Sequence, residues 1–298
     1  MDNLPIINTE TLASCYGQLD TVIFDCRFSL MDPAQGKRLY DEGHIPSAYY
    51  ANLDLDLSDT SQPHAGRHPL PDRERFIGWL ESHGVNDTSM VVGYDHVGGA
   101  LASRFWWLLR WLGIENARLL DGGFNAWSSA KYPLESTANK VNAMTTRGTI
   151  TRTPARIATE EIDTIMDIAS GKSDLTILDA REVERYNGER EPIDPVAGHV
   201  PHAINAPFAD NLNSDKTFRS EDELRMRFES ILGSGFDPTR VIHMCGSGVT
   251  ACHNLIAMEI AGLHGSRLYP GSFSQWVDDA ARPVETKMTS VGDMEPGE

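Results

Sequence analysis

Cysteine is scarce in this chain of 298 residues, which contains only Cys15, Cys26, Cys245 and Cys252. No two of them form a Cys-x-x-Cys pair, and none stands at a zinc-ligand spacing from a histidine. The pattern therefore predicts neither a disulfide framework nor a metal site.

Basic residues and long apolar runs are also lacking. Lys and Arg number 26 against 43 Asp and Glu, so the formal net charge is −17. We do not expect so acidic a chain to bind nucleic acid or an anionic membrane as its main partner. The N-terminus has no basic region followed by an apolar run, and no stretch approaches the length of a membrane span. We therefore expect a cytoplasmic protein without a membrane partner.

What the chain does contain is an internal repeat. Four segments of the first half recur in the same order in the second half, at offsets of 149 to 155 residues. The pairs are 21–27 with 176–181, 43–48 with 198–203, 91–95 with 241–245, and 118–127 with 267–276. We infer a duplicated domain, with copies over 5–133 and 158–285. The Thr-, Ser- and Asn-rich stretch 134–157 is expected to be a linker, and 286–298 a tail.

Each copy alternates short apolar strands with helical stretches. This alternation predicts an α/β fold in which each copy forms a mainly parallel sheet flanked by helices. The helical pattern is clearest over 73–83, 100–113, 160–170, 221–232 and 250–262. In open sheets of this kind, ligands bind beyond the carboxyl ends of the strands.

One cysteine stands at such a strand end. Residues 241–244 predict a buried strand, Cys245 opens a loop with Gly246 and Gly248, and a helix is expected from Thr250. The free N–H groups and the dipole at a helix N-terminus favour a thiolate over a thiol. Glycines allow the loop to turn successive N–H groups toward one sulfur atom. The segment therefore predicts a reactive cysteine.

The two copies differ at this position. The residue that matches Cys245 in the N-terminal copy is Asp95. An aspartate cannot accept or pass on a sulfur atom, so this chemistry is expected from the C-terminal copy alone.

The loop from Cys245 to Cys252 reads Cys-Gly-Ser-Gly-Val-Thr-Ala-Cys, and it resembles the active-site loop of the two-domain rhodanese superfamily in its 3-mercaptopyruvate sulfurtransferase form. The resemblance implies two tandem rhodanese-like domains and transfer of sulfur from 3-mercaptopyruvate, through a Cys245 persulfide, to cyanide or to a thiol acceptor such as a small dithiol protein. No metal or organic cofactor is implied. The loop N–H groups of Gly246, Gly248, Val249 and Thr250 would bind the sulfur.

Substrate-binding arginines are also implied by the resemblance. Arg185 matches the arginine that holds the substrate carboxylate in the family, a task that suits a guanidinium. The family's second arginine would fall at residue 194, which is Asp194 here. Carboxylate binding is therefore expected from Arg185 alone, or with Arg190.

The resemblance further implies a Ser/His/Asp relay that polarises the substrate carbonyl. Its expected members are Ser247, His68 and Asp56, with Asp54 and Asp59 as competitors for the acidic place.

Three alternative functions fit the sequence less well. A thiosulfate sulfurtransferase would use the same cysteine, but such enzymes often carry basic residues directly after it, where this chain has Gly246 and Ser247. A phosphatase on the same fold needs an arginine in the loop, which is absent between Cys245 and Cys252. A persulfide carrier would load with sulfur but would not turn over. Cys252 is expected to be packed and inert.

Overall fold

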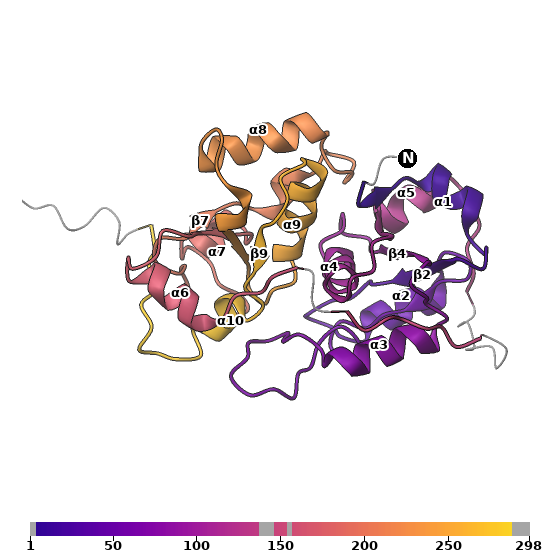
Figure 1. Ribbon diagram of the computed structural model, residues 1–298, viewed down its shortest axis with the longest axis horizontal. Coiled ribbons are helices and arrows are strands. Elements are labelled where there is room, and N and C mark those ends of the chain that lie inside the picture. The colour runs from indigo at the N-terminus through magenta and orange to yellow at the C-terminus, as the bar shows by residue number, and fades with distance from the viewer. Residues whose placement is uncertain (1–3, 137–145, 154–156, 288–298) are drawn as a thin grey trace, which may run out of the picture.

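The computed structural model describes residues 4–136, 146–153 and 157–287, and it contains one parallel sheet in each half of the chain (Figure 1). The N-terminal sheet has the order β1-β5-β4-β2-β3, and the C-terminal sheet has the order β7-β6-β8-β9. Their strands are β1 Ile6–Ile7, β2 Thr21–Asp25, β3 Tyr49–Tyr50, β4 Met90–Tyr94, β5 Ala117–Leu120, β6 Thr176–Asp179, β7 Ile204–Asn205, β8 Val241–Met244 and β9 Arg267–Leu268. The predicted tandem α/β architecture is confirmed.

Helices flank both sheets. Those of the N-terminal half are α1 Thr9–Cys15, α2 Gln35–Glu42, α3 Arg73–Ser82, α4 Ala102–Leu112 and α5 Gly123–Ser129. Those of the C-terminal half are α6 Ile162–Ala169, α7 Val183–Tyr186, α8 Glu221–Leu232, α9 Ala251–Ile260 and α10 Ser272–Trp276, with 3₁₀ turns η1 Phe208–Asn211 and η2 Pro238–Arg240. The five predicted helices are confirmed as α3, α4, α6, α8 and α9, to within two residues at each end. None of the described helices is long and apolar enough to cross a bilayer.

The two halves meet along α4 and α9, which lie side by side (Figure 1). Each of these helices follows the central strand of its own sheet, so the duplicated elements pack against each other. Trp106 and Trp107 on α4 and Leu255 on α9 belong to one buried apolar cluster that runs through both halves. Burial of this much aromatic and aliphatic surface fixes the two halves against each other.

The matching strands β2 and β6 end in the same buried ion pair. Arg27 donates to Asp25 at 2.6 Å, and Arg181 donates to Asp179 at 2.6 Å. The guanidinium of Arg181 also donates to the carbonyl of Gly198, as that of Arg27 does to Gly43. These pairs tie the repeated Gly-His segments to the strand ends, which is a structural role that both copies share.

The described part of the predicted linker lies on the N-terminal half. Ile150 is buried and its N–H donates to Glu81 on α3, while Arg147 forms an ion pair with the same carboxylate at 2.9 Å. Residues 146–153 therefore extend the first domain. The domain limits at 133 and 158 stay predictions, and residues 288–298 of the tail lie outside the described chain.

Candidate active site

Cys245 lies at the carboxyl end of β8 and is almost fully buried. Its own N–H donates to the hydroxyl of Ser272 at 3.1 Å. Helix α10 is hydrogen-bonded to the start of the loop. Phe273 N–H donates to the Cys245 carbonyl at 3.0 Å, and Ser274 N–H donates to the Gly246 carbonyl at 2.8 Å. The carbonyl oxygens at the start of the loop are thereby fixed toward α10.

The N–H groups of the same loop are left without acceptors. Within the described chain, no hydrogen bond is donated by the backbone of residues 246–250. Gly248 has φ +74°, and a Cβ there would lie 2.4 Å from the carbonyl oxygen of Pro270, so only glycine fits. Because free N–H groups at a strand-to-helix junction bind anions, the loop suits a thiolate or a persulfide.

The N-terminal copy shows what this loop conformation can hold. Four backbone N–H groups donate to the Asp95 carboxylate at 2.7–2.9 Å, namely those of Val97, Gly99, Leu101 and Ala102. Gly98, which matches Gly248, has almost the same φ, +73°. The loop thus holds the protein's own carboxylate in the N-terminal copy, and Cys245 stands at the matching position in the C-terminal copy.

The structure brings two of the three expected relay residues together across the domain boundary. Ser247 Oγ lies 2.7 Å from His68 Nδ1, and His68 Nε2 lies 3.2 Å from Asp54 Oδ1. The expectation for Asp56 is therefore wrong. Asp56 instead accepts the N–H of Asn52 at 2.8 Å within its own turn, whereas Asp54 is turned toward the imidazole.

The protonation of His68 follows from its surroundings. Burial lowers the pKa of His68, the hydrogen bond to Asp54 raises it, and the positive charges of Arg104 and Arg67 lower it again. The net shift is downward, so the imidazole is neutral at physiological pH. A neutral ring can accept the Ser247 hydroxyl proton at Nδ1 while Nε2–H points at Asp54.

A segment of the N-terminal domain, residues 64–68, reaches over to the C-terminal domain beneath α10 (Figure 1). We call this segment the strap. His64 pairs with Asp278 at 2.5 Å, and the strap N–H of Arg67 donates to Ser274 at 2.9 Å. Gly66 has φ +88°, and a Cβ there would lie 2.5 Å from a backbone oxygen of the C-terminal domain. These contacts carry Arg67 and His68 to the cysteine loop.

Two guanidinium groups stand beside Gly246. From the position that a Cβ of Gly246 would take, Arg67 Nη2 is 3.2 Å away, and Arg185 Nη2 and Nη1 are 3.4 and 3.5 Å away. Arg185, expected from the resemblance to bind the substrate, thus lies beside the cysteine loop. Arg190 is exposed, and none of its atoms is among the three nearest to that point. The second cation beside Gly246 is Arg67, which no spacing in the sequence indicated, although it precedes His68 directly.

Arg104 on α4 joins the cysteine loop to the strap. Its side chain is fully buried and donates to the carbonyl oxygens of Gly248 at 3.1 Å, His68 at 3.1 Å and Pro69 at 3.3 Å. A single buried cation therefore fixes both sides of the junction at which Ser247 meets His68.

Cys252 lies in the first turn of α9 and is fully buried. Burial raises the pKa of its thiol to about 12, and the Sγ donates to the Gly248 carbonyl at 3.4 Å. A thiol that stays protonated is a poor nucleophile. This agrees with the packed, inert role expected of Cys252.

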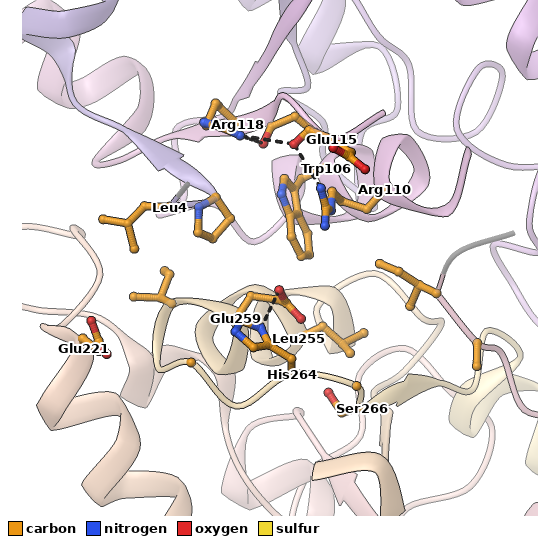
Figure 2. Close-up of a pocket in the computed structure, with 17 residues that line it drawn as sticks. Leu4, Trp106, Arg110, Glu115, Arg118, Glu221, Leu255, Glu259, His264 and Ser266 are labelled. Atoms are coloured by element: carbon orange, nitrogen blue, oxygen red, sulfur yellow. Dashed lines mark hydrogen bonds and ion pairs between the residues drawn. The ribbon is translucent and has the colours of Figure 1, made fainter. Parts of the chain in front are cut away.

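A separate cavity of about 850 Å³ opens between the domains, away from Cys245 (Figure 2). Trp106 and Arg110 of α4 face Leu255 and His264 of the other domain across it. The residues that line it include no member of the cysteine loop. In the described part of the chain, no three His, Cys, Asp or Glu side chains are grouped so that they could hold a metal ion.

The chain is similar to a known domain family and to several known sulfurtransferases. A family model described as rhodanese-like domain matches residues 9–130 and 163–279. A probable 3-mercaptopyruvate sulfurtransferase of Pseudomonas aeruginosa is 42% identical over 293 residues, covering 96% of this chain and 99% of the relative. The putative thiosulfate sulfurtransferase SseB of Mycobacterium tuberculosis is 36% identical, with 94% and 96% covered. The solved structure of 3-mercaptopyruvate sulfurtransferase from Leishmania major is similar with a TM-score of 0.81 at 29% identity, covering 93% of this chain and 75% of that one.

Proposed function

This chain belongs to the rhodanese family, with two rhodanese-like domains in tandem, and from that premise we propose that it is a 3-mercaptopyruvate sulfurtransferase that works through a Cys245 persulfide. One observation carries the proposal. Cys245 opens a loop whose N–H groups donate no backbone hydrogen bond within the described chain, and whose Ser247 lies 2.7 Å from a neutral histidine of the other domain. The loop supplies a nucleophile and a place for its negative charge, and the Ser–His pair supplies a polarising hydroxyl.

The first half-reaction moves the sulfur atom to the enzyme. The Cys245 thiolate attacks the sulfur of 3-mercaptopyruvate, an S–S bond forms, and the C–S bond breaks with its electron pair passing into the enolate of pyruvate. The thiol proton of the donor ends on the methyl carbon. The free N–H groups of residues 246–250 stabilise first the thiolate and then the persulfide, as fixed dipoles that need no reorganisation.

The Ser247–His68–Asp54 chain acts on the donor's keto group. The Ser247 hydroxyl donates to the carbonyl oxygen, where negative charge develops as the enolate forms. His68 stays neutral and hydrogen-bonded, while Asp54 orients the ring from its other nitrogen. In the second half-reaction, a thiol acceptor such as a small dithiol protein, or cyanide, attacks the outer sulfur atom and restores the Cys245 thiolate.

The charges around Gly246 support a monoanionic donor. Arg67 and Arg185 are offset by Asp194 and Glu191, so these four groups sum to zero. A carboxylate adds one negative charge to such a site, whereas thiosulfate adds two. Thiosulfate is nevertheless the second candidate donor, because the Mycobacterium tuberculosis relative bears that name.

Steady-state sulfur transfer to cyanide tests the proposal, with 3-mercaptopyruvate and thiosulfate assayed side by side in the native protein and in Cys245→Ser. We expect the larger kcat/KM with 3-mercaptopyruvate and none in Cys245→Ser. A preference for thiosulfate would reverse the donor assignment. Sulfur loading without turnover would identify a carrier, and activity in Cys245→Ser would reject the mechanism.

A further inference from the structure

We propose that the donor's carboxylate is bound between the two domains, by Arg67 Nη2 and Arg185 Nη1, which makes Arg67 of the N-terminal domain a donor-specificity residue. This inference rests on the proposed function. It differs from the expectation of a carboxylate site built within the C-terminal domain alone.

Asp194 fixes the two guanidinium groups relative to each other. Its Oδ1 accepts from Arg67 Nη1 at 2.7 Å, and its Oδ2 accepts from Arg185 Nη2 at 2.9 Å. The Asp194 side chain is almost fully buried, and the Arg185 side chain is 11% exposed. Asp194, which occupies the family's second arginine position, thus binds an arginine of the other domain, Arg67.

The remaining Nη donors of both arginines lie close to one point. Arg185 uses Nε and Nη2 on Glu191 and Asp194, which leaves Nη1. Arg67 uses Nη1 on Asp194, and its Nε is buried without a partner in the described chain. Arg67 Nη2 and Arg185 Nη1 lie 3.2 and 3.5 Å from the point where a Cβ of Gly246 would stand.

An acceptor with two oxygens satisfies this arrangement. A carboxylate can take one N–H from each arginine, and charge-assisted bonds of this kind are the strong ones. Gly246 is the residue after Cys245, so a carboxylate held there lies beside the nucleophile. Because Gly246 has no side chain, nothing of residue 246 stands between the backbone and these guanidinium nitrogens, whereas a basic residue in that position would fill the point that they surround.

The test compares 3-mercaptopyruvate with its uncharged methyl ester as sulfur donor, in the native protein, Arg67→Met and Arg67→Lys. Loss of one charge-assisted bond predicts a kcat/KM for the acid that is roughly tenfold to a hundredfold lower in Arg67→Met. The value for the ester should stay the same, because the ester carboxyl offers no charge. Arg67→Lys should fall between, since an ammonium cannot bond to Asp194 and to the donor in the same fork geometry. Arg38→Met, which removes an exposed arginine paired with Asp32, is the matched control and should retain native preference.

The outcomes separate the inference from the function it rests on. Equal losses for acid and ester in Arg67→Met would mean that Arg67 only holds the strap, and would overturn the inference. An unchanged acid preference, or its loss in Arg190→Met instead, would overturn it as well. If the native protein fails to transfer sulfur from 3-mercaptopyruvate at all, the proposed function fails. The carboxylate site is then tested by calorimetric binding of pyruvate, which the inference predicts for the native protein and not for Arg67→Met.

Discussion

Replacing Arg104 by Met removes a buried cation that holds both sides of the catalytic junction. The change removes one donor from each of the carbonyl oxygens of Gly248, His68 and Pro69, of which Gly248 keeps the Cys252 thiol and Pro69 keeps the N–H of Asp59. Each hydrogen bond from a charged group contributes about 1.5–3 kcal/mol, but the fully buried guanidinium also costs desolvation, which lowers the pKa of Arg104. We therefore expect the free energy of unfolding to fall by roughly 3–5 kcal/mol rather than by the full sum.

Function should suffer as well, because Gly248 belongs to the cysteine loop and His68 to the strap. In the folded Arg104→Met protein we expect kcat with 3-mercaptopyruvate to fall by roughly a hundredfold, because displacing a reacting group by about 1 Å has an effect of that size. Denaturant unfolding and steady-state sulfur transfer measure the two effects. Arg110→Met, on the same helix and bonded to the Glu115 carbonyl, is the control and should change stability by less than about 0.5 kcal/mol.

The reasoning would be refuted if Arg104→Met matched Arg110→Met in both stability and kcat. It would be refuted in part if stability fell and kcat in the folded fraction did not. In that case Arg104 would hold the domain interface without positioning Ser247 against His68.

Three further predictions concern the relay, the loop and the core. Asp54→Asn should move the acid limb of kcat/KM to lower pH, because the reaction needs neutral His68 and Asp54 raises its pKa, whereas Asp56→Asn should leave the limb in place. Gly248→Ala should abolish persulfide formation and destabilise the fold by more than about 1 kcal/mol, because a Cβ at φ +74° meets the backbone of Pro270. Mass spectrometry measures the persulfide, and denaturation measures the stability. Burial lowers the pKa values of His243 and His253 to about 3 and about 4, so below pH ~6.5 each of them binds a proton only on unfolding. As the pH falls, the free energy of unfolding should therefore decrease by roughly 1.4 kcal/mol per pH unit for each histidine. His253→Gln should remove about half of this slope, as measured by denaturation at pH 7 and pH 5.

Local sequence signals predicted the architecture well, and Cys245 stands in the expected strand, loop and helix. The loop after residue 244 combines a strand end, two glycines and a helix start, all within a dozen residues. Its duplicate around Asp95 made the domain repeat visible. The helices α1, α2, α5, α7 and α10 were not predicted, because helices of four to eight residues gain their stability from tertiary contacts rather than from their own sequence.

Contacts between distant residues were the part that the sequence could not predict. Asp54 and Asp56 lie two residues apart, and the choice between them depends on how Asn52 turns the backbone, with its side chain accepting the N–H of Asp54. Arg67 reaches Asp194 over 127 residues and across a domain boundary. Such a pair leaves no periodicity or spacing that a single sequence reveals.

A single-turnover experiment tests the central claim, that Cys245 carries the sulfur of 3-mercaptopyruvate, most directly. The protein is mixed with 3-mercaptopyruvate without an acceptor, released pyruvate is counted, and peptide fragmentation locates the bound sulfur. We predict one pyruvate per chain and one added sulfur atom on Cys245, which cyanide then removes. Sulfur located on Cys15, Cys26 or Cys252, or pyruvate released without sulfur on the protein, would contradict the account.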